Sequence, residues 1–402
     1  MRIFPFSSRI EVEKMMHDIG VDPCGVKIML PKAQTFLILL NTVNSITANI
    51  LKQEMLAIGA ESAITRGALT GKSKKTDVLM IASLSQYRRL LQKIRLQPFG
   101  LNNLSQELDK NIKNYTKHNF TLSLRSSFLN LSNQARIMGI INLTPDSFSG
   151  DGLYKNCAAN YLDLALKKAK KMVSDGASII DLGGQSSRPG AKPVSAKEEL
   201  TRILPVVKLL AKKIKTPLSI DTDKPIVAQA CLDSGAQIIN DISGLRHKNM
   251  IKVAVRYKAA VVIMHMQGVP LSMQKIVTYR YLIDEIALYL KKAINSAEGG
   301  GINPDKIIVD PGIGFGKNVE HNLEIINRLA DFKILGKPIL IGTSRKSFIG
   351  KILGADVGNR SSGSLATCVI AAKNGANILR VHDVKETSQA LKIVNAIRKN
   401  KL

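Results

Sequence analysis

The chain has 402 residues and a net charge of +27, and 45% of its residues are hydrophobic. That hydrophobic content supports a folded core and excludes a disordered chain, and the length fits one large domain with a smaller one. Residues 1–134 carry 18 Lys and Arg against 9 Asp and Glu, and residues 135–402 carry 40 against 22, so the basic excess is spread evenly. Because nucleic-acid binders concentrate their charge in a tail or patch, we expect no nucleic-acid partner.

The first residues and the cysteines bear on the cellular compartment. The opening MRIFPFSSRIEVEKMM lacks the apolar core of a signal peptide. The most apolar run, TFLILL at 35–40, is too short to cross a bilayer. The four cysteines lie far apart and form no CxxC pair, which argues against a disulfide framework and against a zinc site. We therefore expect a cytoplasmic protein with no membrane partner.

Residues 1–120 predict a small α/β domain of unknown role. Short apolar runs alternate with helical segments, with strands at 35–40, 62–65 and 77–82 and helices at 44–60 and 85–94. The loop RGALTGKSKKTD is one residue too short for the phosphate loop GxxxxGKS/T, so a packing or oligomerisation module is favoured over a nucleotide site. A polar, Asn-rich stretch follows, and residues 121–135 are assigned as a linker.

From Arg136 onward one pattern occurs eight times: an apolar run rich in Ile and Val, then an amphipathic stretch of helical period. The runs lie at 137–142, 178–183, 217–222, 237–242, 261–266, 306–312, 338–346 and 377–383. Continuous apolar runs are typical of parallel strands that are covered on both faces. Eight such units predict a (β/α)8 TIM barrel for residues 136–402, with a doubly wound open sheet as the alternative.

Each of the eight runs ends in polar residues. They are Asn142, Asp181, Asp221, Asn240 with Asp241, His265, Asp310, Ser344 with Lys346, and Arg380 with His382. The carboxyl ends of barrel strands meet on one face, where these folds build their active sites. We therefore expect these side chains to converge on one cavity.

The residue types in this set indicate what the cavity binds. Asp221, Asn240 and Asp310, with Lys346, suit a flat heterocycle that bears adjacent N–H, amino and carbonyl groups. A second group favours phosphate-like oxygens: Arg188, Arg380 and His382. Asn142 offers an oxygen to a hard cation such as Mg²⁺. The combination predicts a heterocycle that carries a di-anionic leaving group.

Three loops accompany the strand ends. LTPDSFSGDG and GGQSSRPGAKPVS combine Pro, Gly and Ser with one Phe and one Arg, which suggests covers that exclude water, although ordinary turns share this composition. DPGIGFGK has the spacing GxGxG, which is not the dinucleotide fingerprint GxGxxG. Here a close approach of the backbone to a ligand is favoured, with Phe315 as a wall.

The ordered motifs MGIINLTPDSFSGDG, DLGGQSSRPGA, SIDTDKP, NDISG, IMHMQGVPLSMQ, DPGIGFGK, GTSRKSFIG and RVHDV resemble those of the dihydropteroate synthase family. The resemblance covers about residues 136–399. It implies a transferase of folate biosynthesis that sulfonamides inhibit. The implied reaction condenses 6-hydroxymethyl-7,8-dihydropterin pyrophosphate with 4-aminobenzoate and releases pyrophosphate, with Mg²⁺ as cofactor. It also implies a homodimer.

The resemblance assigns roles residue by residue. The pterin ring would be held by Asp221, Asn240, Asp310 and Lys346. Pyrophosphate and its metal would be bound by Asn142, Arg188, Arg380 and His382, with Asn142 as the metal ligand. The aminobenzoate site would be shaped by Phe148, Ser187, Pro189, Phe315 and Ser347. Catalysis would rest on Arg188, Lys346, Arg380 and His382.

Two loops depart from the family pattern. The first reads Ser-Gly-Asp-Gly where the family commonly has SFSDGG, which places Asp151 one position late after Gly150. In the second, Gln185 replaces an acid and Ser187 a threonine. These changes bear on loop closure and on sulfonamide sensitivity.

Two other functions fit parts of the pattern. A pterin-binding barrel that resembles the corrinoid-dependent methyltetrahydrofolate methyltransferases has no pyrophosphate to hold, and Arg188, Arg380, His382 and the SRK motif at 344–346 argue against it. A degenerate barrel that serves as a scaffold, or a basic nucleic-acid binder, would not need to retain the motif set.

Overall fold

The computed structural model describes residues 9–125, 127–132, 134–144, 160–186, 194–268, 273 and 277–399. The chain divides into two units: Met1–Lys113 with Arg398–Leu402, and Asn114–Ile397. The boundary falls near the end of helix α6 (Leu101–Tyr115). Among the described helices, none has the length and apolar character that a membrane span requires.

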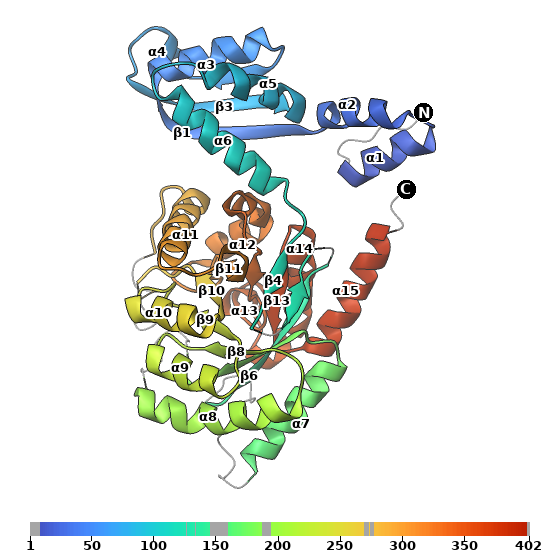
Figure 1. Cartoon of the computed structure of the whole chain (residues 1–402), viewed down its shortest axis with the longest axis vertical. Helices are drawn as coiled ribbons and strands as arrows, with labels where there is room; N and C mark the ends of the chain where they lie inside the picture. Colours follow the sequence, from blue (N-terminus) through green and yellow to red (C-terminus); the bar gives the residue numbers. More distant parts are fainter. Residues whose placement is uncertain are drawn as a thin grey trace. The chain divides into compact units, whose positions relative to one another are not determined.

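The larger unit is a closed barrel of eight parallel strands with helices around the outside (Figure 1). The strands are β6 (Arg136–Asn142), β7 (Ile179–Gly183), β8 (Leu218–Asp221), β9 (Ile238–Asp241), β10 (Ala260–Met264), β11 (Ile307–Asp310), β12 (Leu340–Ile341) and β13 (Ile378–Val381). Their order is β11-β10-β9-β8-β7-β6-β13-β12, and a parallel bridge between Val309 and Ile339 joins the two ends. The predicted TIM barrel is confirmed, and the bridge excludes the open sheet.

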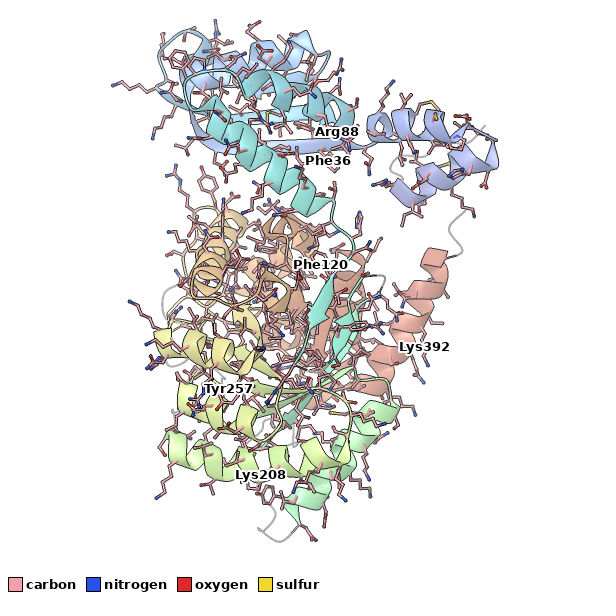
Figure 2. The ribbon with its side chains drawn as sticks, viewed as in Figure 1. Phe36, Arg88, Phe120, Lys208, Tyr257 and Lys392 are labelled. Atoms are coloured by element: carbon pink, nitrogen blue, oxygen red, sulfur yellow. The ribbon has the colours of Figure 1, made fainter. Side chains whose placement is uncertain are left out.

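Helices follow the strands as the sequence pattern predicts. They are α7 (Tyr161–Ser174), α8 (Ala196–Lys213), α9 (Pro225–Asp233), α10 (Lys248–Tyr257), α11 (Leu282–Gly299), α12 (Val319–Asn327), α14 (Ser361–Lys373) and α15 (Val384–Lys399). Their apolar sides bury against the sheet, and Figure 2 shows Lys208 and Lys392 on the outer faces of α8 and α15. The basic excess therefore lies partly on exposed helix faces.

The seventh repeat differs from the prediction. The sequence indicated a strand through residues 338–346, but β12 has only two residues and a further helix, α13 (Ser347–Leu353), begins directly after Lys346. Arg345 has a left-handed backbone with φ 57°, which turns the chain from the strand end into this helix. The helix ends at Gly354, which is also left-handed.

A short hairpin closes the amino-terminal end of the barrel. Its strands are β4 (Thr121–Ser123) and β5 (Phe128–Asn130), and the segment that the sequence analysis assigned as a linker therefore belongs to the barrel unit. Leu122 and Leu131 are fully buried in one cluster with the first inward-facing layer of the barrel strands. Lys306 Nζ also donates to the carbonyl of Ser123 at 2.9 Å. Phe120, labelled in Figure 2, belongs to the same cluster.

The strand period of two separates the barrel interior into an apolar and a polar layer. Ile179, Ile238, Ile308 and Ile378 lie in the apolar cluster above the hairpin. Two residues further along the same strands are Asp181, Asn240, Asp310 and Arg380. Because side chains two positions apart share a face, this polar layer forms the floor of the barrel mouth.

The smaller unit is a three-stranded antiparallel sheet with helices on one face. The strands β1 (Thr35–Asn44), β2 (Glu61–Ile64) and β3 (Lys75–Ser83) are arranged in the order β1-β3-β2. The helices α3 (Ser45–Ala57), α5 (Leu84–Ile94) and α6 bury one side of the sheet around the fully buried Tyr87. Phe36 of β1, labelled in Figure 2, packs against this core. The other helices are α1 (Arg9–Asp18), α2 (Pro23–Ala33) and α4 (Arg66–Leu69).

We predict that the hairpin stabilises the barrel. Leu122→Ala should lower the free energy of unfolding by about 2–5 kcal/mol, because it leaves a cavity among buried side chains. Phe128→Ala on the same hairpin removes a side chain that is 74% exposed, so it should cost less than about 1 kcal/mol. Urea unfolding followed by circular dichroism measures both losses. Equal midpoints for the two variants would show that the hairpin does not contribute to the stability of the barrel.

Candidate active site

Three of the predicted site residues lie together at the carboxyl ends of adjacent or nearby strands. Asp221 and Asn240 are register partners on β8 and β9, and Asp310 ends β11. All three are buried, and each faces the barrel interior. Asp310 Oδ1 accepts a hydrogen bond from the Gly312 N–H at 2.7 Å, which fixes the orientation of the carboxylate.

Arg380 lies between two carboxylates. Its Nε donates to Asp181 Oδ2 and its Nη2 to Asp221 Oδ2, each at 2.7 Å. Asn240 Nδ2 donates to the same Asp181 oxygen at 3.2 Å. Asp181 has no exposed surface. The sequence analysis placed it among the strand ends that converge, but it assigned Asp181 no binding partner. Its inward position two residues after Ile179 was the available signal.

The electrostatics of this cluster follow from burial. Burial raises the pKa of Asp221, with Arg380 opposing the shift and Asp181 adding to it. Burial also raises the pKa of Asp310, against the Gly312 N–H and the charge of Lys346. Although burial alone would lower the pKa of the Arg380 guanidinium, Asp181 and Asp221 raise it, so this group stays charged. The floor is thus a mixed cluster in which one cation serves two acids.

Lys346 and Phe315 form a neighbouring pair. Lys346 Nζ lies 4.2 Å from the centre of the Phe315 ring, a cation–π contact. Phe315 is buried in a small cluster with Ile242, Met264 and Met266. The Lys346 stem also lies 3.2 Å from the position that a Cβ on Gly314 would occupy. The loop after β11 and the start of α13 therefore meet at this ring.

The Ser-Arg-Lys motif supports the end of β13. Ser344 Oγ lies 3.1 Å from His382 Nδ1 and accepts the His382 backbone N–H at 3.3 Å. Arg345 binds Asp383 through two bonds, at 3.2 and 2.6 Å. Burial, with Arg345 and Arg380 nearby, lowers the pKa of His382 well below its usual range, so the ring is neutral. The sequence analysis placed Ser344 among the converging strand ends, but it did not predict its contact with His382 or the pairing of Arg345 with Asp383.

A buried lysine lies beside the carboxylates. Lys317 Nζ lies 2.9 Å from His265 Nδ1 and donates to the Phe315 carbonyl at 3.1 Å. Burial lowers the pKa of Lys317 to about 7, with Asp310 opposing the shift. Burial likewise lowers the pKa of His265 to about 2, so this ring is neutral. Lys317 closes the DPGIGFGK motif, but sequence reasoning assigned it no role.

The glycines of this motif are required by the close approach of the backbone. Gly312 has φ 74°, and a Cβ there would lie 1.9 Å from the carbonyl oxygen of His265. Gly316 has φ 62°, and a Cβ there would lie 2.9 Å from the backbone and side chain of Gln267. Any other residue at Gly312 would push the loop off the end of β10.

The departure at Gln185 has a local explanation. Lys224 Nζ donates to Glu199 Oε2 at 2.7 Å, and it also donates to Gln185 Oε1. Glu199 is fully buried on α8, so it already supplies the counter-charge for Lys224. Because Glu199 already neutralises Lys224, the side chain at position 185 only needs to accept a hydrogen bond from Lys224, and the neutral amide of Gln185 does so.

Asn142 offers oxygen chemistry at the first strand end. Its Oδ1 and the Asp221 carboxylate flank Gly183, at 3.7 and 3.9 Å from the position of a Cβ there. In the described residues, no three His, Cys, Asp or Glu side chains gather as a metal cage. This donor set fits Mg²⁺, which keeps most of its waters and takes few protein ligands when it binds substrate phosphates. It does not fit a zinc site.

The remaining predicted site residues have different outcomes. Ser347 is exposed at the first position of α13. Outside the described residues lie Phe148, Ser187, Arg188 and Pro189, together with the Gly150-Asp151 departure.

The sequence matches known proteins over the barrel. The family described as "Pterin binding enzyme" matches residues 138–382. The dihydropteroate synthase of Escherichia coli (strain K12) is 46% identical over 260 residues, which are 65% of this chain and 90% of that protein. The Yersinia pestis dihydropteroate synthase, solved with a sulfonamide drug complex, is 43% identical with a TM-score of 0.66 and covers 70% of this chain and 100% of its own.

One relative matches beyond the barrel. The probable bifunctional folylpolyglutamate synthase/dihydropteroate synthase of Halobacterium salinarum is 34% identical over 382 residues. The match takes in 94% of this chain and 45% of that protein, so it includes most of the residues before the barrel.

We predict that Arg380→Met destabilises the barrel by about 3–5 kcal/mol at pH 8, because it leaves Asp181 and Asp221 buried without a counter-charge. Burial already raises the pKa of Asp221, and without Arg380 this pKa would lie further above the unfolded value of about 4, so stability would fall as pH rises through that window. The loss should therefore be smaller at pH 5. Arg328→Met, which breaks only half-exposed pairs, should cost about 0–1 kcal/mol at both pH values. The midpoints of urea unfolding at pH 8 and pH 5 measure these losses. A loss for Arg380→Met that is the same at both pH values would contradict the pairing of Arg380 with the two carboxylates.

Proposed function

The chain belongs to the dihydropteroate synthase family of pterin binding enzymes, and on this premise we propose that it condenses 6-hydroxymethyl-7,8-dihydropterin pyrophosphate with 4-aminobenzoate. The products are 7,8-dihydropteroate and pyrophosphate, so the enzyme is a transferase of folate biosynthesis. The observation that carries the proposal is the buried polar floor of Asp221, Asn240 and Asp310 at the barrel mouth. These groups match the hydrogen-bonding edge of a pterin, which offers N–H and amino donors beside a carbonyl.

The pterin half would be held by rigid strand ends. Asp310 and Asp221 accept from the ring donors, and Asn240 offers both a donor and an acceptor. Lys346 would donate to the ring from the start of α13. Because the Gly312 N–H and Arg380 already orient the two carboxylates, little rearrangement is needed when the ring enters.

The pyrophosphate half would gather donors at the neighbouring strand ends. Arg188 and Arg380 supply cations, and His382 supplies a neutral N–H. We assign the His382 proton to Nε2, because the Ser344 hydroxyl accepts the His382 backbone N–H and can donate its own proton to Nδ1. Asn142 would offer its oxygen to Mg²⁺, which would supply charge stabilisation on the departing phosphate oxygens.

An aromatic amine is neutral and nucleophilic at pH 7, so a strong general base gains little. The barrier is then lowered chiefly by groups that stabilise the leaving pyrophosphate. Charge-assisted hydrogen bonds contribute about 1.5–3 kcal/mol each, so a few of them supply several powers of ten in rate. The aminobenzoate would lie against Phe315 and Ser347, with Phe148, Ser187 and Pro189 from the two long loops.

We further propose that the protein is a cytoplasmic homodimer. The described cysteines Cys24, Cys231 and Cys368 are free thiols, which suits a reducing compartment. In the described part of the chain, β3 is the only strand that pairs with β1, so β1 presents an outer edge. That edge reads TFLILLNTVN without one charge, although edge strands of monomers are usually guarded by Lys or Pro. A second copy fits it, because an antiparallel edge pairs with itself about a twofold axis.

We predict that the purified full chain forms dihydropteroate only when Mg²⁺ is present. Asp310→Asn should lower kcat/KM by about 10- to 100-fold, because a charged acceptor of ring donors is lost. Asp233→Asn on the surface of α9, where Asp233 accepts a hydrogen bond from the Tyr257 hydroxyl, is the matched control and should retain activity. A correctly folded chain that yields no product, measured by chromatography of the pteroate, would remove the proposal.

For the homodimer, we predict that Leu39→Lys weakens self-association measured by analytical ultracentrifugation. Leu39 is 56% exposed on β1, so its replacement should leave the fold intact while placing like charges on the paired edges. Leu96→Lys, at a position that is 89% exposed and outside the sheet, should not change the association. Equal association of both variants would rule out the β1 edge.

A further inference from the structure

Lys317 is a buried lysine whose role the proposed chemistry does not explain. Its side chain is 3% exposed, and no carboxylate oxygen of the described residues forms an ion pair with its Nζ. Its partners are a neutral imidazole nitrogen and a backbone carbonyl instead. Because a buried amine without an ion pair is costly, a hydrophobic side chain would be the cheaper occupant of this position.

The two bonds of Lys317 join two segments of the site. His265 directly follows β10, and its backbone N–H donates to the Asp310 carbonyl at 2.9 Å. Its ring packs edge-on against Tyr289, with centroids 4.9 Å apart. Phe315 lies in the loop after β11. Lys317 therefore holds the end of one strand and the loop of the next.

The loop is also held by other contacts: the Gly314 N–H donates to Asn322 Oδ1 at 2.7 Å, and the Phe315 ring packs in the cluster with Ile242 and Met264. The Phe315 N–H donates to the Gly312 carbonyl at 3.2 Å, and the Tyr279 hydroxyl donates to the Gly316 carbonyl at 2.9 Å. Glycines on both sides of Phe315 leave its backbone permissive. The Lys317 bond to the Phe315 carbonyl restrains the peptide between Phe315 and Gly316, and it thereby limits where the ring can lie against Lys346.

We propose that Lys317 is a positioning residue for the aminobenzoate half of the site: through the His265 ring and the Phe315 carbonyl it holds the Phe315 wall against Lys346. It does not touch the substrate itself. This inference rests on the proposed function for the identity of the ligand, and on the hydrogen bonds alone for the placement of the ring.

The kinetic test compares Lys317→Met with Lys337→Met. Lys337 is a second buried lysine, 9% exposed, that donates to Glu298 Oε1 at 2.7 Å and to the Pro304 carbonyl at 2.9 Å, at the amino-terminal end of the barrel. Lys317→Met should raise KM for 4-aminobenzoate about tenfold or more, with KM for the pterin pyrophosphate changed less than about threefold. Lys337→Met should leave both values within about threefold, whatever it does to stability. Equal changes in both KM values for Lys317→Met would overturn the proposal.

A second measurement needs no reaction. Incorporation of 4-fluorophenylalanine gives a ¹⁹F signal for each Phe, and Phe315→Leu identifies the signal of Phe315. That signal should shift or broaden in Lys317→Met and stay in place in Lys337→Met. An unchanged Phe315 signal in Lys317→Met would refute the positioning role even in an active enzyme. If the parent chain forms no dihydropteroate, the proposed function fails and the fluorine signal still decides the role of Lys317.

Discussion

The site depends on one constraint: carboxylates that are buried at the barrel mouth are costly unless a cation is paired with them. Arg380 meets this need by pairing with both Asp181 and Asp221. An uncompensated charge in this position would cost several kcal/mol, so the cluster holds its own geometry. The same pairing keeps the Asp221 carboxylate aimed in one direction, which is the preorganisation that a ligand-binding acid requires.

The two halves of the barrel mouth are built by different means. The half around Asp221, Asn240 and Asp310 uses strand ends, whose direction is set by the sheet and by the period of two. The half around Phe315 uses the loop between β11 and α12, in which left-handed glycines let the backbone lie against the end of β10. A loop of this kind needs a tether that strands do not need, and Lys317 provides one.

The opposite end of the barrel serves stability. The β4–β5 hairpin fills the opening with Leu122 and Leu131, beneath an apolar layer of the strands. The polar residues of the candidate site and the hairpin that closes the barrel therefore lie at opposite ends of the strands. A substitution at one end can change the site or the stability of the barrel without changing the other. The unit that precedes the barrel has its own core around Tyr87, so its sheet does not depend on the barrel for burial.

The sequence by itself determined the eight repeats and the polar residues at the strand ends. Both can be read from the local sequence, because each apolar run is followed directly by its own polar residue. The sequence therefore predicted the positions of Asp221, Asn240 and Asp310. Only the tertiary structure decided that Arg380 binds Asp181, since the two are 199 residues apart and their contact arises from the closing of the sheet. The same holds for Lys317 with His265, 52 residues apart, and for the hairpin, whose short strands have no core until the barrel supplies one.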